Sequence, residues 1–128
     1  CVYPTSIFIE LKYLKAAKKK LKRSKLDFVF SAKKYEHPIF RSFYLNSNKL
    51  ICPVFNNRKN EKKRTQDFKE TLHDAGQFYI GYKNSWKLKK NIIYGNAGFV
   101  ELPRLGSSDI DNISDWNSAK ILWKMLNK

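Results

Sequence analysis

The sequence predicts an α/β domain whose sheet contains parallel strands. The apolar segment 1–5, "CVYPT", precedes a segment with helical spacing at 10–25, and a second apolar segment follows at 26–34. A strand, a helix and a strand in this order form a right-handed parallel crossover. The loop after 1–5 would then lie at the carboxyl end of its strand, where open α/β sheets bind ligands. We expect one domain over residues 1–128.

The first three elements are predicted from the spacing of apolar residues. Residues 1–8 are expected to form a buried strand that runs into a loop from Pro4. The expected helix over 10–25 has lysines around most of its surface and one apolar face, made of Leu11, Leu14, Ala17 and Leu21. The segment 26–34, "LDFVFSAKK", is expected to be the next buried strand.

Residues 35–66 predict a hairpin, because the apolar runs "SFYL" and "LICPVF" flank an Asn-Ser-Asn turn. The basic segment 56–66, "NNRKNEKKRTQ", is expected to be an exposed loop or arm.

Two strands and a helix are expected in the remaining part of the chain. The strands should lie within 77–82 and 92–102, which are rich in aromatic and β-branched residues. The helix should begin near Ser114 as its N-cap, with Asp115 in the first turn. Its apolar face would be made of Trp116, Ala119, Trp123 and Leu126.

Composition limits the classes of partner. The formal net charge is +15, yet lysine outnumbers arginine by 21 to 5, whereas proteins that bind nucleic acids favour arginine for bidentate contacts. We expect a solvated lysine surface and no nucleic-acid partner, with general attraction of anions as the alternative. No apolar run reaches the ~20 residues of a membrane helix, and Cys1 and Cys52 make no disulfide framework or metal motif. We therefore expect a cytoplasmic protein without a membrane partner.

A polar cluster directly ahead of the strand at 77–82 is the first candidate site. His73 and Asp74 are adjacent, so in a strand they point in opposite directions and do not form a catalytic dyad; structural hydrogen bonding at a turn is the alternative. Gly76 allows a backbone to approach a ligand closely, and Gln77 offers two donors and an acceptor. This combination predicts binding of a polyhydroxylated ligand.

Two carboxylates form the second candidate site. Asp109 and Asp111 are two residues apart, so in an extended backbone their side chains point to the same side. Such oxygen ligands suit Mg²⁺ carried on a phosphate. The alternative, which the residues leave equally open, is that Asp111 caps the turn before the last helix.

Hydroxyl and basic residues complete the candidates. Arg64 can bind a carboxylate or phosphate through two hydrogen bonds, or it is a solvated loop charge. Thr5 and Ser6 offer hydroxyls at the mouth of the first loop, or they cap the helix that follows. No Walker A, GxGxxG, CxxC or HExxH motif is present in the sequence.

Five of these segments resemble, in this order, motifs of the acylneuraminate cytidylyltransferases. They are "CVYPTS" followed by Phe8, "RTQD", "HDAGQFY", "ELPR" and "DID…DW", and they cover the chain from Cys1 to about Trp123. The segment "HDAGQFY" is nearly the signature of the branch that uses pseudaminic acid. Five motifs in the right order are far more specific than any one of them.

The resemblance implies a nucleotide-diphospho-sugar-transferase-like, Rossmann-like three-layer fold, with 35–66 as a hairpin dimerisation arm of a homodimer. It also implies a reaction, in which the anomeric hydroxyl of a nine-carbon sugar acid attacks the α-phosphate of CTP and releases pyrophosphate. Mg²⁺ would be bound by Asp109 and Asp111. The residues implied to line the sugar-acid side are Thr5, Ser6, Arg64, Gln66, His73, Asp74, Gly76 and Gln77.

The sequence also departs from the family pattern. Ile7 and Glu10 stand where the family has Pro and Arg, and Phe68-Lys69 replaces Leu-Pro. The first strand and the basic, glycine-containing loop that holds the CTP triphosphate have no counterpart in the sequence. We therefore expect the C-terminal part of such an enzyme, not competent alone and completed by an N-terminal half. The alternatives are a non-catalytic basic module that binds anionic polymers and a decayed fragment.

Overall fold

The computed structural model describes residues 1–56, 60–105 and 108–127. The chain divides into two compact units. The first, here called the sheet unit, combines Cys1–Lys33 with Asp74–Lys128, and the second, the hairpin unit, is Lys34–His73. Two strands, β1 and β4, cross the boundaries between them. Each unit is described by itself below.

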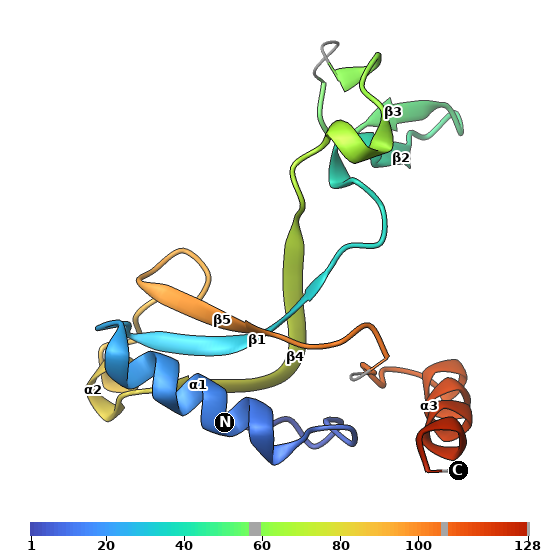
Figure 1. Ribbon diagram of the computed structural model, residues 1–128. Coiled ribbons are helices and arrows are strands. Elements are labelled where there is room, and N and C mark those ends of the chain that lie inside the picture. Colours follow the sequence, from blue (N-terminus) through green and yellow to red (C-terminus); the bar gives the residue numbers. More distant parts are fainter. Residues whose placement is uncertain (57–59, 106–107, 128) are drawn as a thin grey trace. The chain divides into compact units, whose positions relative to one another are not determined.

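A three-stranded sheet, in the order β4-β1-β5, is the centre of the sheet unit (Figure 1). Strands β1 (Phe28–Lys34) and β5 (Ala97–Glu101) pair in parallel, with Phe28 opposite Ala97 and Ala32 opposite Glu101. Together with the helices, this sheet confirms the predicted mixed α/β class with parallel strands. The finer Rossmann-like description stays a prediction.

Strand β4 (Leu72–Gly81) lies between the first segment of the chain and β1. Val2 forms an antiparallel bridge with Phe78, and the Tyr3 amide donates to the Gln77 carbonyl at 3.1 Å. The prediction that segment 1–5 forms a buried strand was therefore wrong. This segment lies on the outer side of β4, and Val2 is 51% exposed.

The direction of the first segment was nevertheless predicted correctly. Strand β4 runs opposite to β1, because Ser31 contacts the backbone of Gln77 whereas Phe28 lies beside Gly81. A Cβ at Gly81 would lie only 2.4 Å from the Phe28 ring, so glycine is needed for this close approach. Since Val2 also runs opposite to β4, segment 1–3 and β1 are parallel to each other. A strand from late in the chain was inserted between them.

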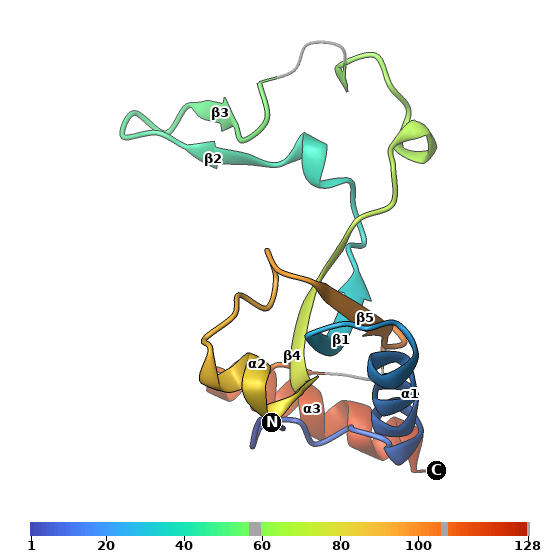
Figure 2. The ribbon, with the colours of Figure 1, turned by 90° about the vertical axis from the view of Figure 1, so that its left-hand side faces the viewer.

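Helix α1 (Leu11–Arg23) has the predicted amphipathic character. Its Ala17 and Leu21 are buried in a core cluster with Val29, Phe78 and Leu102. The helix lies beside β5 (Figure 2), where the Lys20 ammonium donates to the carbonyl of Phe99 at 2.9 Å. Apolar burial of this kind holds helix and sheet together.

The later elements differ from the expectations in their limits. Helix α3 (Ile113–Leu126) is present, but its N-cap is Asn112 and not Ser114. The Asn112 side chain accepts from the Asp115 amide, and the Asp115 carboxylate accepts from the Asn112 amide, so the two residues form a capping box. Strand β5 begins at Ala97 because residues 91–96 form a turn, in which the Tyr94 amide donates to the side chain of Asn91.

A short helix, α2 (Lys83–Lys87), was not predicted. Its buried Ser85 donates to Asp27, and the following Lys90 pairs with the same carboxylate at 2.7 Å. A helix of five residues carries too few apolar positions to show a period.

The hairpin unit contains the predicted antiparallel pair, β2 (Phe43–Leu45) and β3 (Ile51–Pro53). Asn46 accepts from the amides of Asn48 and Leu50, which closes the predicted Asn-Ser-Asn turn. Two 3₁₀ turns, η1 (Ile39–Arg41) and η3 (Thr65–Asp67), flank the pair. Part of the expected loop at 56–66, residues 57–59, lies outside the described residues.

None of the described helices is long and apolar enough to cross a lipid bilayer.

Candidate functional site

The candidate site contains a local turn within strand β4, formed by the residues around Gly76. Gly76 has φ +61°, a left-handed conformation that favours glycine. The Asp74 carboxylate fixes this turn, since its Oδ1 accepts from the Gly76 amide at 2.9 Å and its Oδ2 accepts from the Tyr79 hydroxyl. Burial and then the hydrogen bond to Asp74 raise the pKa of Tyr79, so the phenol stays a proton donor to Asp74. Asp74 therefore has a structural role in this turn.

Gln77 is buried in the sheet unit, with an exposed fraction of 0%. Its Nε2 donates to the carbonyls of Ala75 and Ser108 at 3.2 and 3.3 Å. Its Oε1 has no partner among the described residues. The sequence predicted a side chain that contacts hydroxyls of a ligand, whereas the structure places it in the core and in contact with the loop before α3.

The loop before α3 brings Asp109 to Gly76. A Cβ built on Gly76 would lie 3.5 Å from Oδ2 of Asp109, so this exposed carboxylate covers the side of the turn where glycine has no side chain. Asp111 is exposed as well, and its amide donates to the Asp115 carboxylate at 3.1 Å. The capping box of α3 thus consists of Asn112 as the N-cap and Asp115 as its acidic residue, and the capping alternative for the Asp111 side chain was wrong.

The two predicted hydroxyl residues have different environments. Ser6 is buried, and its Oγ donates to the Gln77 carbonyl at 2.7 Å, which ties the first loop to β4. Thr5 is half-buried at the same loop. Neither residue is the N-cap of α1, because Glu10 occupies that position. The structure therefore brings Ser6, Asp74, Gly76, Gln77 and Asp109 together in the sheet unit.

The remaining predicted ligands lie in the hairpin unit. Arg64 pairs with Asp67 through Nε at 3.2 Å and Nη2 at 3.3 Å, and this pairing lowers the pKa of Asp67. Gln66 is exposed in the same 3₁₀ turn. The His73 ring lies 4.8 Å from the ring of Tyr35, a tilted aromatic contact. In this structure Arg64 and His73 both have partners within their own unit.

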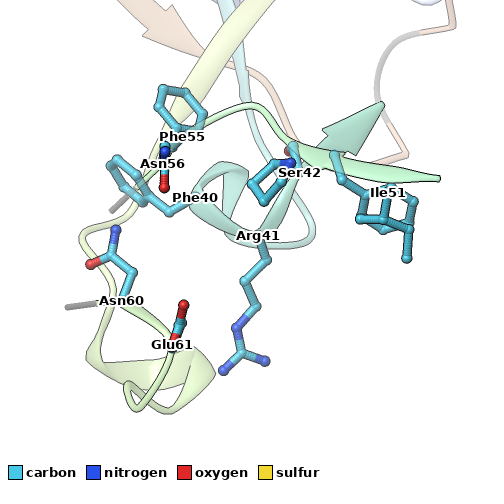
Figure 3. Close-up of a pocket in the computed structure, with 10 residues that line it drawn as sticks. Phe40, Arg41, Ser42, Ile51, Phe55, Asn56, Asn60 and Glu61 are labelled. Carbon is cyan, nitrogen blue, oxygen red and sulfur yellow. The ribbon is translucent and has the colours of Figure 1, made fainter. Parts of the chain in front are cut away.

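Two pockets were not predicted from the sequence. One, of about 350 Å³, lies in the hairpin unit, where Figure 3 shows the rings of Phe40 and Phe55 close together and Arg41 and Glu61 extending from neighbouring segments. The other, of about 460 Å³, lies in the sheet unit and is lined mainly by apolar residues, among them Phe8 and Trp123. Neither contains a residue that the sequence marked as a ligand, and long-range packing of this kind has no local signal.

The donor set at Asp109 and Asp111 consists of carboxylate oxygens, which suit a hard cation such as Mg²⁺. Among residues 1–56, 60–105 and 108–127, no three His, Cys, Asp or Glu side chains are grouped as metal ligands. A cation at this place would therefore complete its coordination with water or with substrate oxygens.

No protein-family model matches the chain, but curated proteins do. The chain is 37% identical over 125 residues to the pseudaminic acid cytidylyltransferase of Campylobacter jejuni serotype O:2, and 36% identical over 125 residues to that of serotype O:23/36. Both alignments cover 98% of this chain. It is also 33% identical over 111 residues to a Helicobacter pylori protein named pseudaminic acid cytidylyltransferase and UDP-2,4-diacetamido-2,4,6-trideoxy-beta-L-altropyranose hydrolase.

Coverage of these relatives is partial. The chain spans about half the length of the two Campylobacter proteins, 53% in each case, and 21% of the Helicobacter protein.

Proposed function

Because this chain belongs to the family of the pseudaminic acid cytidylyltransferases, we propose that it forms part of an enzyme that transfers CMP from CTP to a nonulosonic acid. The observation that carries the proposal is the similarity over 98% of the chain. The anomeric oxygen of the sugar acid would form a bond to the α-phosphorus of CTP, while the bond to pyrophosphate breaks. Reactions of this type depend mainly on positioning and on neutralising phosphate charge.

Asp109 and Asp111 are the proposed Mg²⁺ ligands. Mg²⁺ keeps several waters and is usually bound by one or two carboxylates together with substrate phosphates, so two exposed carboxylates are a sufficient protein contribution. When bound there, the ion would neutralise the negative charge of the reacting phosphates. The protein's own part is to hold both carboxylates on the loop between β5 and α3.

The sugar acid is proposed to lie against the turn at Asp74–Gln77 and the first loop with Thr5 and Ser6. The turn at Gly76 lies next to the Asp109 carboxylate, so a ligand against this turn would be beside one of the proposed Mg²⁺ ligands. Arg64, Gln66 and His73 remain predicted ligands of the substrate. For Arg64 this requires that a substrate carboxylate replaces Asp67 as its partner.

We expect the chain alone to bind Mn²⁺ or Mg²⁺ but not to turn over CTP, because it spans about half of its relatives. The test measures pyrophosphate release from CTP and pseudaminic acid by the chain alone and by the chain mixed with the unmatched half of the Campylobacter relative. Activity only in the mixture supports the proposal. Asp109→Asn and Asp111→Asn should each abolish it, whereas Glu61→Gln, the same charge change in the hairpin unit, should not. A mixture that stays inactive while the full-length relative turns over would count against it.

A second copy of the chain is the proposed partner of the hairpin unit. Apolar side chains of β2 and β3 are exposed, Tyr44 by 59% and Ile51 by 64%. Exposed apolar groups gathered on one short hairpin are typical of an interface.

One observation favours a second candidate function, binding of an anionic polymer. Helix α1 contains seven Lys and Arg residues and no acidic residue, and all seven are exposed. Salt distinguishes the two functions, since binding to many phosphates weakens steeply between about 50 and 200 mM salt. Binding of a nucleotide sugar in a pocket should change little over this range. Steep loss of DNA or polyphosphate binding, without any cytidylyltransferase activity in the mixture above, would favour the second candidate.

A further inference from the structure

Gln77 is a fully buried polar side chain on strand β4. It has an exposed fraction of 0%, and the following residue, Phe78, belongs to the central hydrophobic cluster. Both of its hydrogen-bond partners, the carbonyls of Ala75 and Ser108, are acceptors only. The orientation of the amide is therefore determined: the nitrogen faces the two carbonyls and the oxygen faces away.

The amide oxygen makes this arrangement costly. Gln77 Oε1 is buried and has no partner in the described part of the chain, and a buried polar atom without a partner destabilises the folded state. An apolar side chain of the same length would avoid this cost. What it would lose is the donation to Ser108, a residue 31 positions away in the sequence, while Ala75 lies only two residues away on the same strand. The hydrogen bond to Ser108 is thus what the Gln77 amide provides and an apolar side chain would not.

Ser108 immediately precedes the carboxylate that covers Gly76. Two adjacent residues of β4 consequently contact two adjacent residues of the loop: Gln77 binds the carbonyl of Ser108, and Gly76 lies beside the carboxylate of Asp109. The β4 side of this contact is itself fixed, because Asp74 holds the amide of Gly76. The Gln77 side chain thus holds this loop through a hydrogen bond between residues that are 31 positions apart in the sequence.

We propose that Gln77 is a positioning residue, which sets the place of the Asp109 carboxylate by binding the carbonyl of Ser108. The part of this proposal that concerns cation binding rests on the proposed function of Asp109 as an Mg²⁺ ligand. Residues that form hydrogen bonds to a metal-binding residue orient that residue, and their loss typically weakens metal binding about 10–100-fold.

The test replaces the amide with an isosteric thioether, Gln77→Met, in the complete chain. This change removes both donated hydrogen bonds and the unpaired oxygen together. We expect lower heteronuclear NOE values for the amides of Ser108, Asp109 and Ile110, which report faster motion of this loop. Mn²⁺ is the probe for the carboxylate, and broadening of the Gly76 signal should require about tenfold more Mn²⁺ than in the unchanged chain.

Ser31→Ala is the matched control. The Ser31 hydroxyl is buried and accepts from the backbone amides of Gln77 and Phe78, so its loss perturbs the same part of β4 without touching the loop. The control should leave the loop signals and the Mn²⁺ titration unchanged. A general loosening of the strand would instead alter both variants equally, and that result would overturn the proposal.

Other outcomes are also decisive. Unchanged NOE values at Ser108–Ile110 in a folded Gln77→Met chain would overturn the positioning role. If that variant does not fold, the hydrogen bond is tested in the unchanged chain. The side-chain amide protons of Gln77 should exchange slowly with solvent and should show an NOE to the Asp109 amide. The absence of both signals would refute the bond from Gln77 to Ser108. Failure of Mn²⁺ to broaden Gly76 in any chain would refute the cation site of the proposed function, while the loop signals still test Gln77.

Discussion

The sheet unit and the hairpin unit are both rich in aromatic and branched apolar residues, but they bury them very differently. The sheet unit holds all eleven buried hydrophobic residues of the described chain. In the hairpin unit no described residue is buried; Phe43 and Tyr44 are 57% and 59% exposed. The difference lies in the number of layers: helix α1 covers the sheet, whereas the strands of the hairpin are three residues each and a two-stranded hairpin is marginally stable alone. Apolar composition therefore predicts a core only where a second layer exists to cover it.

The largest expected effect sharpens this comparison with one substitution in each unit. Phe78→Ala should lower the free energy of unfolding by about 3–5 kcal/mol, because it opens a cavity at a residue with no exposed surface. Phe43→Ala should change it by no more than about 0.5 kcal/mol, since an exposed ring loses little on truncation. Urea unfolding of both variants, followed by tryptophan fluorescence, measures the two values. Equal losses would mean that the hairpin unit contributes to the same core.

The second prediction makes the same comparison within one helix. Leu21→Ala should destabilise the chain by about 2–4 kcal/mol, because Leu21 is 5% exposed and packs in the core cluster. Leu11, on the same helix α1, is 63% exposed, so Leu11→Ala should cost less than about 0.5 kcal/mol. Thermal unfolding of the two variants checks the pair. A large loss at Leu11 would show that the first turn of α1 is covered in solution.

Helix α1 also illustrates what the sequence could predict. Its apolar spacing predicted its limits to within two residues, 10–25 against Leu11–Arg23, and the burial of Ala17 and Leu21, since a 3.6-residue period is a local property. Leu11, which was predicted on the same face, is exposed. The turn at Asn46 was predictable for the same reason, because Asn side chains bind amides two and four residues further on. Both predictions depend only on neighbouring residues.

The candidate site was only partly predictable, because its contacts are long-range. The alternation at Asp109 and Asp111 marked two carboxylates, and the glycine at 76 marked an unusual backbone. No local pattern indicates that β4 is inserted beside segment 1–3, or that Gln77 points into the core and binds Ser108. In the sequence, Gln77 beside Gly76 predicted a side chain that contacts a ligand. Only its burial and its hydrogen bond to Ser108 indicate that it holds the loop before α3.

The third prediction tests what covers the hairpin. If a second copy does so, Ile51→Lys should weaken self-association at least tenfold, about 1.4 kcal/mol, because it places a charge in an apolar interface. Leu88→Lys is the matched control, as Leu88 is 70% exposed in the sheet unit and Ile51 is 64% exposed. Sedimentation equilibrium at several concentrations gives the dissociation constants. A monomer at all concentrations in the unchanged chain would refute the proposed homodimer.

The smallest expected effects concern one carboxylate in each unit. Hydrogen bonds from Lys90 and Ser85 lower the pKa of Asp27 below its ordinary value of 3.8, and Arg64 lowers that of Asp67 in the same direction. For a carboxyl whose folded pKa is depressed, the stabilisation is present at neutral pH and is lost as pH falls below 3.8 through the folded pKa. Both side chains are accessible to solvent, so salt should reduce the shifts.

The two carboxylates should nevertheless differ in what their loss does to the fold. Asp27 joins the start of β1 to α2 and Lys90 within the sheet unit, whereas Asp67 pairs inside a unit in which no described residue is buried. Asp27→Asn should therefore lower the melting temperature slightly at pH 7, and this difference should shrink as pH falls below 3.8 and the native carboxyl becomes protonated. Asp67→Asn should leave the melting temperature unchanged over the same pH range. A loss of melting temperature in Asp67→Asn as large as that in Asp27→Asn would show that the hairpin unit unfolds together with the sheet, and the contrast between the two units would then concern exposure alone and not stability.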